Sequence, residues 1–477
     1  MEQPQCPGCR ERDARIAVLE KQVADLTAQL ARMADRVREL EARLGQNASN
    51  SSIPPSANPP QAPPPVRKKP TGRKPGGQPG HTAHLRQRLP VERLTEPVVH
   101  YVPENCEACQ DALLGAPGPD DPEPRWHQVV ELPEIPVHVT EYQAHGRTCP
   151  GCGHVTWAKI PLEIRAHVCG PRLTATLSVM SGVLHASKRG IEEFVEAVFK
   201  VPIALGTVSN LEQEMSAALA AAHAEAQQAV QEAAAKNVDE TGWKKAGAKR
   251  WLWGAATAAV ACFVITPTRG ALGLAALLGN KIKGIISSDR WSVYAQLKLA
   301  LRQLCWAHLK RDFQKLVDRG SDARDIGEMG LDAVEVVFEL WHSFRGGGIS
   351  RAQLQRQIAP VRQTLHEWLE LGCACKDTKA AAFCANVLAV ESALWTFVRK
   401  EGIEPTNNHI ERMLRPGVLW RKNAFGCHSE AGCRFVERML TVVQTLRLQK
   451  RPVLEFLYQS LLAHRQTQEA PRLLAGA

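Results

Sequence analysis

A heptad repeat of apolar residues in the N-terminal part of the chain strongly limits how that part can fold. Apolar side chains recur at alternating spacings of three and four, with charged residues at most positions between them: Ile16, Leu19, Val23, Leu26, Leu30, Met33, Val37, Leu40 and Leu44. Such a seam, uninterrupted by Gly or Pro, is typical of a coiled coil. We expect residues 1–44 to pair copies of the chain into a homodimer or larger assembly. One amphipathic helix packed on its own domain is the alternative.

The segment after the heptads cannot build a core. Residues 45–82 hold ten prolines, so we expect 45–96 to be an extended linker. Its second half is basic and could lie along a DNA backbone or enter a minor groove, whereas a solvated tether is the alternative. The candidate DNA-binding residues here are Arg67, Lys68, Lys69, Arg73 and Lys74.

The balance of charge favours a polyanionic partner. The formal net charge is +10 at pH 7, and nucleic acid is the commonest partner of such a chain. We see no signal peptide, and no uncharged apolar run approaches the ~18 residues that a membrane span needs. We therefore expect a cytoplasmic, nucleoid-associated protein with no membrane partner. In a reducing compartment, paired cysteines indicate metal before disulfide.

Two Cys-x-x-Cys pairs predict a small zinc-binding domain at residues 97–169. The pairs are Cys106 with Cys109 and Cys149 with Cys152. Four thiolates fill the tetrahedral shell of one Zn²⁺ and leave no open position, so this ion would be structural. Four unligated cysteines are the alternative.

A third pair, Cys6 and Cys9, precedes the heptads directly. In a parallel dimer two copies of this pair could complete a metal site between chains. Free thiols are the alternative.

Residues 170–235 have a helical pattern that resembles a helix-turn-helix. A helix over 190–201 is followed by a second helix, for which Thr207 is the expected N-cap. A second helix beginning with Thr207, Ser209 and Asn210 suits entry into a DNA groove. Ordinary helical packing is the alternative.

From about residue 236 short apolar runs predict a mixed α/β domain. We expect strands at 236–239, 251–260, 262–266 and 283–288, a helix at 271–279, and one more short strand at 304–308. The expected catalytic core comprises residues 236–315 and 401–450. A helical insertion at 316–400 separates the halves of this core, and 451–477 is a C-terminal tail.

Three acids stand at notable places in this pattern. Asp239 lies on the first strand, Asp289 follows a strand at its C-terminal end, and Glu411 lies on a short helix at about 407–415. A ribonuclease H-like fold arranges its metal-binding carboxylates in this order. Each acid also has a local alternative: a turn or cap for Asp239, a cap of the next helix for Asp289, and an ion pair with Arg415 for Glu411.

Three converging carboxylates suit phosphodiester chemistry. In-line attack puts negative charge on the entering and leaving oxygens, and two Mg²⁺ (or Mn²⁺) ions per active site would stabilise both. Mg²⁺ prefers hard oxygen ligands such as carboxylates.

An ordered set of short motifs resembles the transposases of the insertion sequence 66 family along nearly the whole chain. The set comprises the heptads, Asn50-Ser51-Ser52, Arg73-Lys74-Pro75-Gly76-Gly77-Gln78-Pro79-Gly80-His81, both cysteine pairs, Asp239-Glu240-Thr241, the Asp289 segment ending in Tyr294, Cys305-Trp306-Ala307-His308, Asn407-Asn408 with Glu411-Arg412, Leu414-Arg415-Pro416 and Arg421-Lys422-Asn423. The resemblance implies an Asp-Asp-Glu recombinase that acts on terminal inverted repeats. It assigns the three acids to Asp239, Asp289 and Glu411.

The function expected from this reading is DNA strand cleavage and strand transfer between element ends and target DNA. Basic residues near the third acid are candidate phosphate contacts, with a solvated basic face as the alternative: Arg412, Arg415, Arg421 and Lys422. His308 could touch the scissile strand or pack beside Trp306. The rival functions are a non-catalytic DNA-binding regulator with a zinc finger and a non-mobile nuclease of the same fold.

Overall fold

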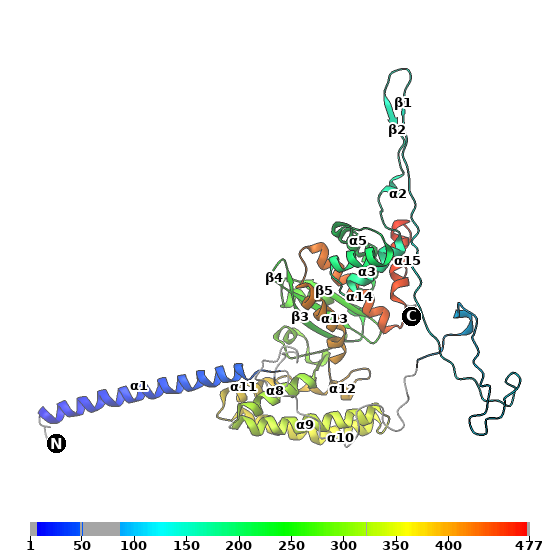
Figure 1. Ribbon diagram of the computed structural model, residues 1–477. Helices are drawn as coiled ribbons and strands as arrows, with labels where there is room; N and C mark the ends of the chain where they lie inside the picture. Colours follow the sequence, from blue (N-terminus) through cyan, green and yellow to red (C-terminus); the bar gives the residue numbers. More distant parts are fainter. Residues whose placement is uncertain (1–6, 48–49, 51–85, 321, 475–477) are drawn as a thin grey trace. The chain divides into compact units, whose positions relative to one another are not determined.

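The computed structural model describes residues 7–47, 50, 86–320 and 322–474, and its contacts divide the chain into two units (Figure 1). One unit holds residues 1–62 and 140–477, and the other holds 63–139. No single helix among the described residues is long and apolar enough to cross a membrane. One bent pair of helices, Thr378–Leu388 with Glu391–Arg399, passes that test by length and composition.

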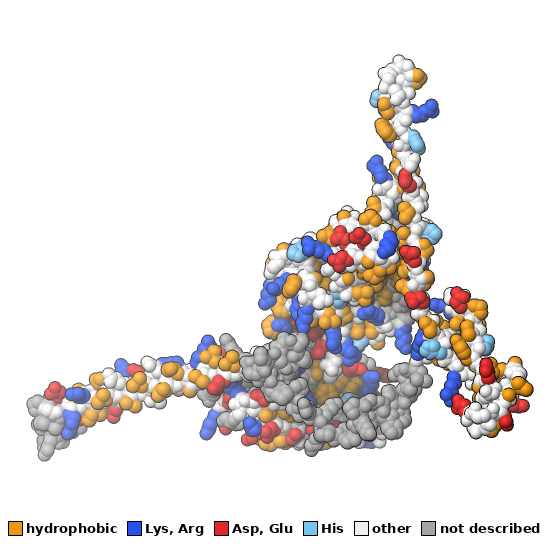
Figure 2. Space-filling model, viewed as in Figure 1, with side chains coloured by type: hydrophobic (Ala, Val, Ile, Leu, Met, Phe, Trp, Pro, Cys, Tyr) orange, Lys and Arg blue, Asp and Glu red, His pale blue; other side chains and the backbone are white. Residues whose placement is uncertain are grey.

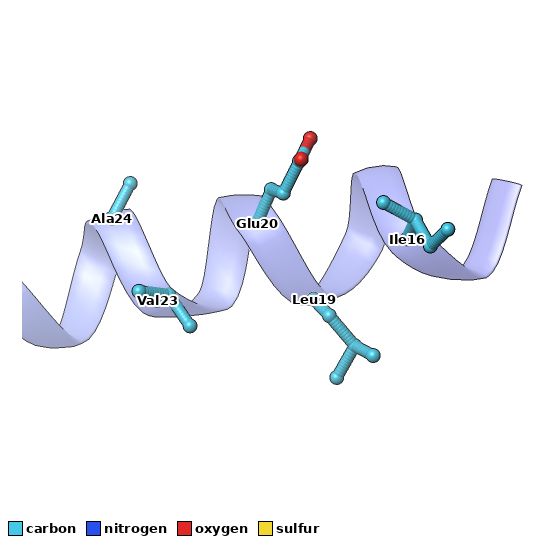
Figure 3. A pocket seen from close by; sticks show the side chains of 5 residues that line it. All are labelled: Ile16, Leu19, Glu20, Val23 and Ala24. Carbon is cyan, nitrogen blue, oxygen red and sulfur yellow. The ribbon is translucent and has the colours of Figure 1, made fainter. Parts of the chain in front are cut away.

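The predicted N-terminal helix is present as α1, Pro7–Leu44. Every residue of its apolar seam is exposed, from 44% at Leu40 to 68% at Leu30 and Leu44, and Figure 2 shows apolar side chains along the length of α1. A shallow apolar hollow lies on the helix between Leu19 and Val23, which point to the same side of it (Figure 3). Pairing of copies along this seam stays a prediction.

A hairpin and a group of helices come before the main sheet. Strands β1 (Gly146–Thr148) and β2 (Val155–Trp157) are antiparallel. The helices that follow are α2 (Leu162–Arg165), α3 (Pro171–Gly182), α4 (Lys188–Phe199), α5 (Leu205–Ala218) and α6 (Ala220–Glu232). A small core joins α3, α4 and α5 through Leu177, Ile191, Val195, Val208 and Leu211.

The expected N-cap of the second helix was wrong. Helix α5 begins at Leu205, with Ala204 as its N-cap, so Thr207 lies inside the first turn. The reason is that the ladder of main-chain hydrogen bonds starts earlier, where the Val208 N–H donates to the Ala204 carbonyl at 3.2 Å.

Five strands form one mixed sheet in the order β5-β4-β3-β6-β7. They are β3 (Ala235–Lys245), β4 (Ala248–Ala256), β5 (Ala261–Thr266), β6 (Ile285–Ser288) and β7 (Arg302–Leu304). Strands β3, β4 and β5 are an antiparallel meander, whereas β6 runs parallel to β3 and β7 runs parallel to β6. Helix α7 (Ala271–Leu278) connects β5 to β6.

Local chemistry explains where these strands turn. Ala246 and Gly247 both have positive φ, 47° and 78°, which is the conformation of a two-residue hairpin turn whose twist matches the flanking strands. Strand β4 ends at Ala256, short of the expected 260, because the Thr257 N–H donates to the Val260 carbonyl at 2.8 Å and closes a turn.

The insertion between β7 and the last helices has its own apolar core. Its elements are α8 (Trp306–Arg319), α9 (Asp322–Arg345), α10 (Arg351–Cys373), α11 (Thr378–Leu388) and α12 (Thr396–Arg399). Helices α9 and α10 lie side by side (Figure 1). Both ends of the insertion meet, because the Trp306 N–H donates to the Pro405 carbonyl at 2.9 Å.

Three helices complete the chain: α13 (Asn408–Ala424), α14 (Glu430–Leu448) and α15 (Val453–Arg465). Helix α13 packs on β3 and β4, and α14 packs on β5. Within the expected C-terminal tail, residues 451–477, α15 packs on α3 and α5.

Helix α14 also hydrogen-bonds the outer edge of the sheet. Glu437, Thr441 and Thr445 accept the main-chain N–H groups of Ile265, Phe263 and Ala261 at 2.5, 3.0 and 3.1 Å. Four residues of helix rise about 6.0 Å and two residues of strand about 6.8 Å, so the two ladders stay in step. These edge amides of β5 are therefore paired although, within the described part of the chain, β5 is the outermost strand of the sheet.

Glu437 makes the stability of this packing depend on pH. Burial raises its pKa to about 7. The folded protein then holds the Glu437 proton more tightly than the unfolded chain does. The stability that this proton contributes is therefore complete below the pKa of the unfolded chain and is lost as pH rises through about 7. We expect Glu437→Gln to remove this dependence. As pH rises from 4.5 to 8, the wild type should lose about 3 kcal/mol of unfolding free energy relative to the variant. Urea unfolding at several pH values measures it, and a difference that stays constant with pH would contradict it.

Candidate active site

The first predicted acid, Asp239, lies in the middle of β3, opposite Gly254 of β4. The Glu240 N–H donates to its Oδ1 at 2.9 Å. Burial, and then the charges of Glu240, Asp289 and Glu411, raise the pKa of Asp239 well above its ordinary value. Carboxyl groups whose pKa is raised by burial and by neighbouring acids are common at functional sites.

The second acid, Asp289, directly follows β6. Strands β3 and β6 are parallel neighbours in which Asn237 is paired with Ser287. Two residues further along each strand the same register leads to Asp239 and Asp289. Asp289 also stabilises the chain turn after it, because the Trp291 N–H donates to its Oδ1 at 2.8 Å.

The third acid, Glu411, lies in the first turn of α13. Its Oε1 is 3.7 Å from Nδ1 of His308 and 3.7 Å from a guanidinium nitrogen of Arg311, both on α8. Among the described side chains, these two are its ion-pair neighbours, in place of the Arg415 considered from sequence. The charges of Asp289 and Glu411 both act on Asp239, so these two acids lie within electrostatic reach of it.

The sequence reasoning missed a buried fourth carboxylate, Glu240. The Tyr294 hydroxyl donates to it at 2.8 Å and Nε of Arg269 donates at 2.7 Å. Burial, together with the charge of Asp289, raises the pKa of Glu240. The guanidinium of Arg269 also lies over the ring of Trp291, 4.0 Å from its centroid. This network fixes the strand beside Asp239 and the turn after Asp289. Its only sequence signal was the pair of motifs that contain Glu240 and Tyr294.

The basic residues of α13 divide into two kinds. Arg412, Arg415 and Lys422 are exposed, and their spacing of three and seven places them on one face of the helix. Arg421 is half-buried and donates to the Thr241 hydroxyl at 3.3 Å and to the Gly242 carbonyl. Arg421 therefore attaches α13 to β3, a role that its prediction as a phosphate contact did not include.

His308 is in the first turn of α8, three residues after Cys305. Burial and the charge of Arg311 lower the pKa of His308, so the neutral ring is favoured. Cys305 is buried and accepts the Asn407 N–H at 3.4 Å, and burial raises its pKa to about 12. The C-terminal end of β6 and the N-terminal ends of α8 and α13 meet at Cys305. Its N–H donates to the Ser288 carbonyl at 2.9 Å, and its sulfur accepts the Asn407 N–H.

The helix-turn-helix candidates are partly occupied by contacts inside the chain. Nζ of Lys188 donates to the Ser209 hydroxyl at 2.6 Å, which ties α5 to α4. Thr207 and Asn210 line a polar hollow that Arg465 of α15 also lines. Asn210 is exposed. The DNA contact expected of this helix stays a prediction.

Each cysteine pair lies in a turn whose amides point at its first sulfur. Hydrogen bonds from the Cys109 and Ala108 main chain lower the pKa of Cys106. Those from Cys152 and Gly151 lower the pKa of Cys149 in the same way.

Such turns favour the thiolate that Zn²⁺ requires. Cys106 and Cys109 belong to one unit and Cys149 and Cys152 to the other. The single four-cysteine zinc site therefore stays a prediction.

Several predicted residues lie outside the described part of the chain. These are Cys6 and the basic linker residues Arg67, Lys68, Lys69, Arg73 and Lys74.

Comparison with known proteins gives two family matches. A family model described as "Transposase IS66 family" matches residues 167–434, more than half of the chain. A family of unknown function (DUF6444) matches residues 2–87.

Two curated proteins of Sinorhizobium fredii (strain NBRC 101917 / NGR234) are similar in sequence. Uncharacterized protein y4qI is 29% identical over 239 residues, which cover 45% of this chain and 43% of that protein. Uncharacterized protein y4hP is 28% identical over 186 residues, 35% of this chain and 34% of that protein. The matched part thus spans less than half the length of either relative.

Proposed function

The chain belongs to the transposase IS66 family, and from this premise we propose that it is the DNA-cleaving and strand-transferring enzyme of a bacterial insertion sequence. Asp239, Asp289 and Glu411 are its proposed metal-binding acids. The observation that carries the proposal is geometric: β3 and β6 are parallel neighbours in register two residues before Asp239 and Asp289, and α13, which carries Glu411, packs on β3.

The strand order supports a ribonuclease H-like core. A three-stranded antiparallel meander followed by two parallel strands, in the order β5-β4-β3-β6-β7, is the arrangement expected of that fold. Its first strand carries Asp239, and Asp289 directly follows the parallel strand beside it. The helical insertion separates Asp289 from Glu411 along the chain.

The three acids fit divalent cations. Burial, and then repulsion from Glu240, Asp289 and Glu411, raises the pKa of Asp239, and bound cations would relieve that repulsion. Asp239, Asp289 and Glu411 would hold two Mg²⁺ or Mn²⁺ ions through hard carboxylate oxygens. Such ions stabilise the charge that develops on the attacking and leaving oxygens of a phosphodiester.

The other residues of the site position the acids and the DNA. Glu240, held by Tyr294 and Arg269, keeps the strand beside Asp239 rigid. The exposed face of α13 that carries Arg412, Arg415 and Lys422 would contact phosphates next to Glu411. The exposed seam of α1 would pair two protomers so that two element ends are handled together.

A donor plasmid with the element's two ends tests the proposal. With Mg²⁺ we expect cleavage at the ends and joining of the freed 3′-OH to target DNA, and with EDTA neither. Donor ends that lack the 3′-OH should bind but give no joined product. Cleavage without joining would favour a non-mobile nuclease, and end binding without cleavage would favour a regulator. Either outcome would overturn the proposal.

A further inference from the structure

Three side chains with metal-ligating atoms meet where α8 and α13 begin. Sγ of Cys305, a ring nitrogen of His308 and a carboxylate oxygen of Glu411 all lie within 4.8 Å of one another. Cys305 is the N-cap of α8 and His308 follows three residues later, so both lie on one side of the first helical turn. Among the described residues, Cys305, His308 and Glu411 are the group of His, Cys, Asp or Glu side chains whose three ligand atoms approach one another this closely.

Two buried atoms of this group have no hydrogen-bond partner among the described residues. They are Nδ1 of His308 and Oε1 of Glu411, which lie 3.7 Å apart. That separation is too long for a hydrogen bond. Zn²⁺ binds nitrogen and oxygen at about 2.0–2.2 Å, so two such ligands on one tetrahedral ion lie about 3.4 Å apart. A shift of a few tenths of an ångström would let both atoms bind one ion.

We propose that Cys305, His308 and Glu411 bind a zinc ion at a site of their own, distinct from the Cys-x-x-Cys pairs. A thiolate and an imidazole select Zn²⁺ or a similar transition metal over Mg²⁺, which prefers oxygen. The Asn407 N–H, which donates to Sγ of Cys305 at 3.4 Å, would support the bound thiolate.

The charges at the site allow one divalent cation. A thiolate and a carboxylate supply two negative charges, and the Cys305 thiol releases its proton when the metal–sulfur bond forms. Arg311 lies 3.7 Å from Oε1 of Glu411 and competes with the ion for that oxygen. Three protein ligands leave the fourth tetrahedral position open to water or another small ligand.

The site has a regulatory consequence, which rests on the proposed function. Glu411 cannot serve the zinc ion and the magnesium pair with the same oxygen. Zinc bound here would withdraw the third acid, so Zn²⁺ should inhibit Mg²⁺-dependent cleavage.

Metal binding to the full-length protein tests the site without relying on activity. After dialysis against Zn²⁺, we expect the wild type to retain one more Zn²⁺ per chain than Cys305→Ser or His308→Gln. Co²⁺ can replace Zn²⁺ as a spectroscopic probe. Cys305→Ser should then lose one equivalent of the sulfur-to-cobalt charge-transfer absorption, and His308→Gln should lose one equivalent of the visible bands of tetrahedral Co²⁺. Cys384→Ser is the matched control, because Cys384 is equally buried but lies in α11, and it should retain the wild-type count. His308→Gln changes a partly exposed side chain and keeps the test valid if Cys305→Ser folds poorly.

The outcomes separate this inference from the proposed function. Equal zinc counts in the wild type and His308→Gln would overturn the zinc site, whatever happens to cleavage. Asp239→Asn should keep the full zinc count even where it abolishes cleavage. Loss of a residue that only supports a metal ligand weakens metal binding roughly 10–100-fold. His308 is a proposed direct ligand, so the zinc concentration that half-inhibits cleavage should rise in His308→Gln by at least that factor. Unchanged inhibition there would refute the regulatory role alone.

Discussion

Asp239→Asn should abolish metal-dependent DNA cleavage and leave binding of element ends intact. The substitution removes one of the three interacting negative charges and keeps the size of the side chain. Losing a metal ligand removes several kcal/mol of transition-state stabilisation, so the cleavage rate should fall at least about a hundredfold. Cleavage of the donor plasmid and a gel-shift assay measure the two effects.

The same substitution should not destabilise the fold. Burial and the neighbouring acids raise the pKa of Asp239, so the native state bears a cost for this carboxylate that asparagine avoids. We expect the melting temperature of the variant to equal or exceed that of the wild type. Asp332→Asn, at an exposed position on α9, should behave as the wild type in both assays. Wild-type cleavage by Asp239→Asn would refute the assignment of this acid.

Thr441→Val together with Thr445→Val should destabilise the sheet strongly. The valines keep the shape of the side chains but remove the oxygens that accept the Phe263 and Ala261 N–H groups of the edge strand. A buried donor left without a partner costs about 1–3 kcal/mol, so the pair should cost roughly twice that. Urea unfolding measures the loss.

The control for this pair is Thr176→Val on α3. The Thr176 hydroxyl bonds the Arg172 carbonyl of its own helix at 2.9 Å, in an exposed position. Its loss should change stability by less than about 0.5 kcal/mol. A double variant as stable as this control would mean that water or a shift of α14 satisfies the edge amides.

The elements that carry the three acids could be predicted because each has a local signal. Ile285 and Ile286 precede Asp289, the first expected strand at 236–239 falls within β3, and the helix expected at about 407–415 overlaps α13. The heptad predicted the helix α1 for the same reason. What pairs with its seam depends on another chain, which one sequence does not describe.

The missed features depend on residues far apart in the chain. Glu240 pairs with Tyr294, 54 residues away, and Glu437 accepts from Ile265, 172 residues away. Neither pairing leaves a periodic pattern in the sequence. The start of α5 was misjudged on a smaller scale, since Thr207 is a good capping residue by type but the helical ladder already begins at Ala204.

The bond between Trp306 and Pro405 has a consequence for how the chain can vary. The insertion leaves and re-enters the core at one place, and it buries an apolar core of its own. A segment closed at its base can be lengthened, shortened or exchanged without moving what it emerges from. Variation in this stretch can therefore leave the five-stranded sheet and the three candidate acids in place, provided that the apolar face of α8 stays covered, because His308 and Arg311 of α8 lie beside Glu411.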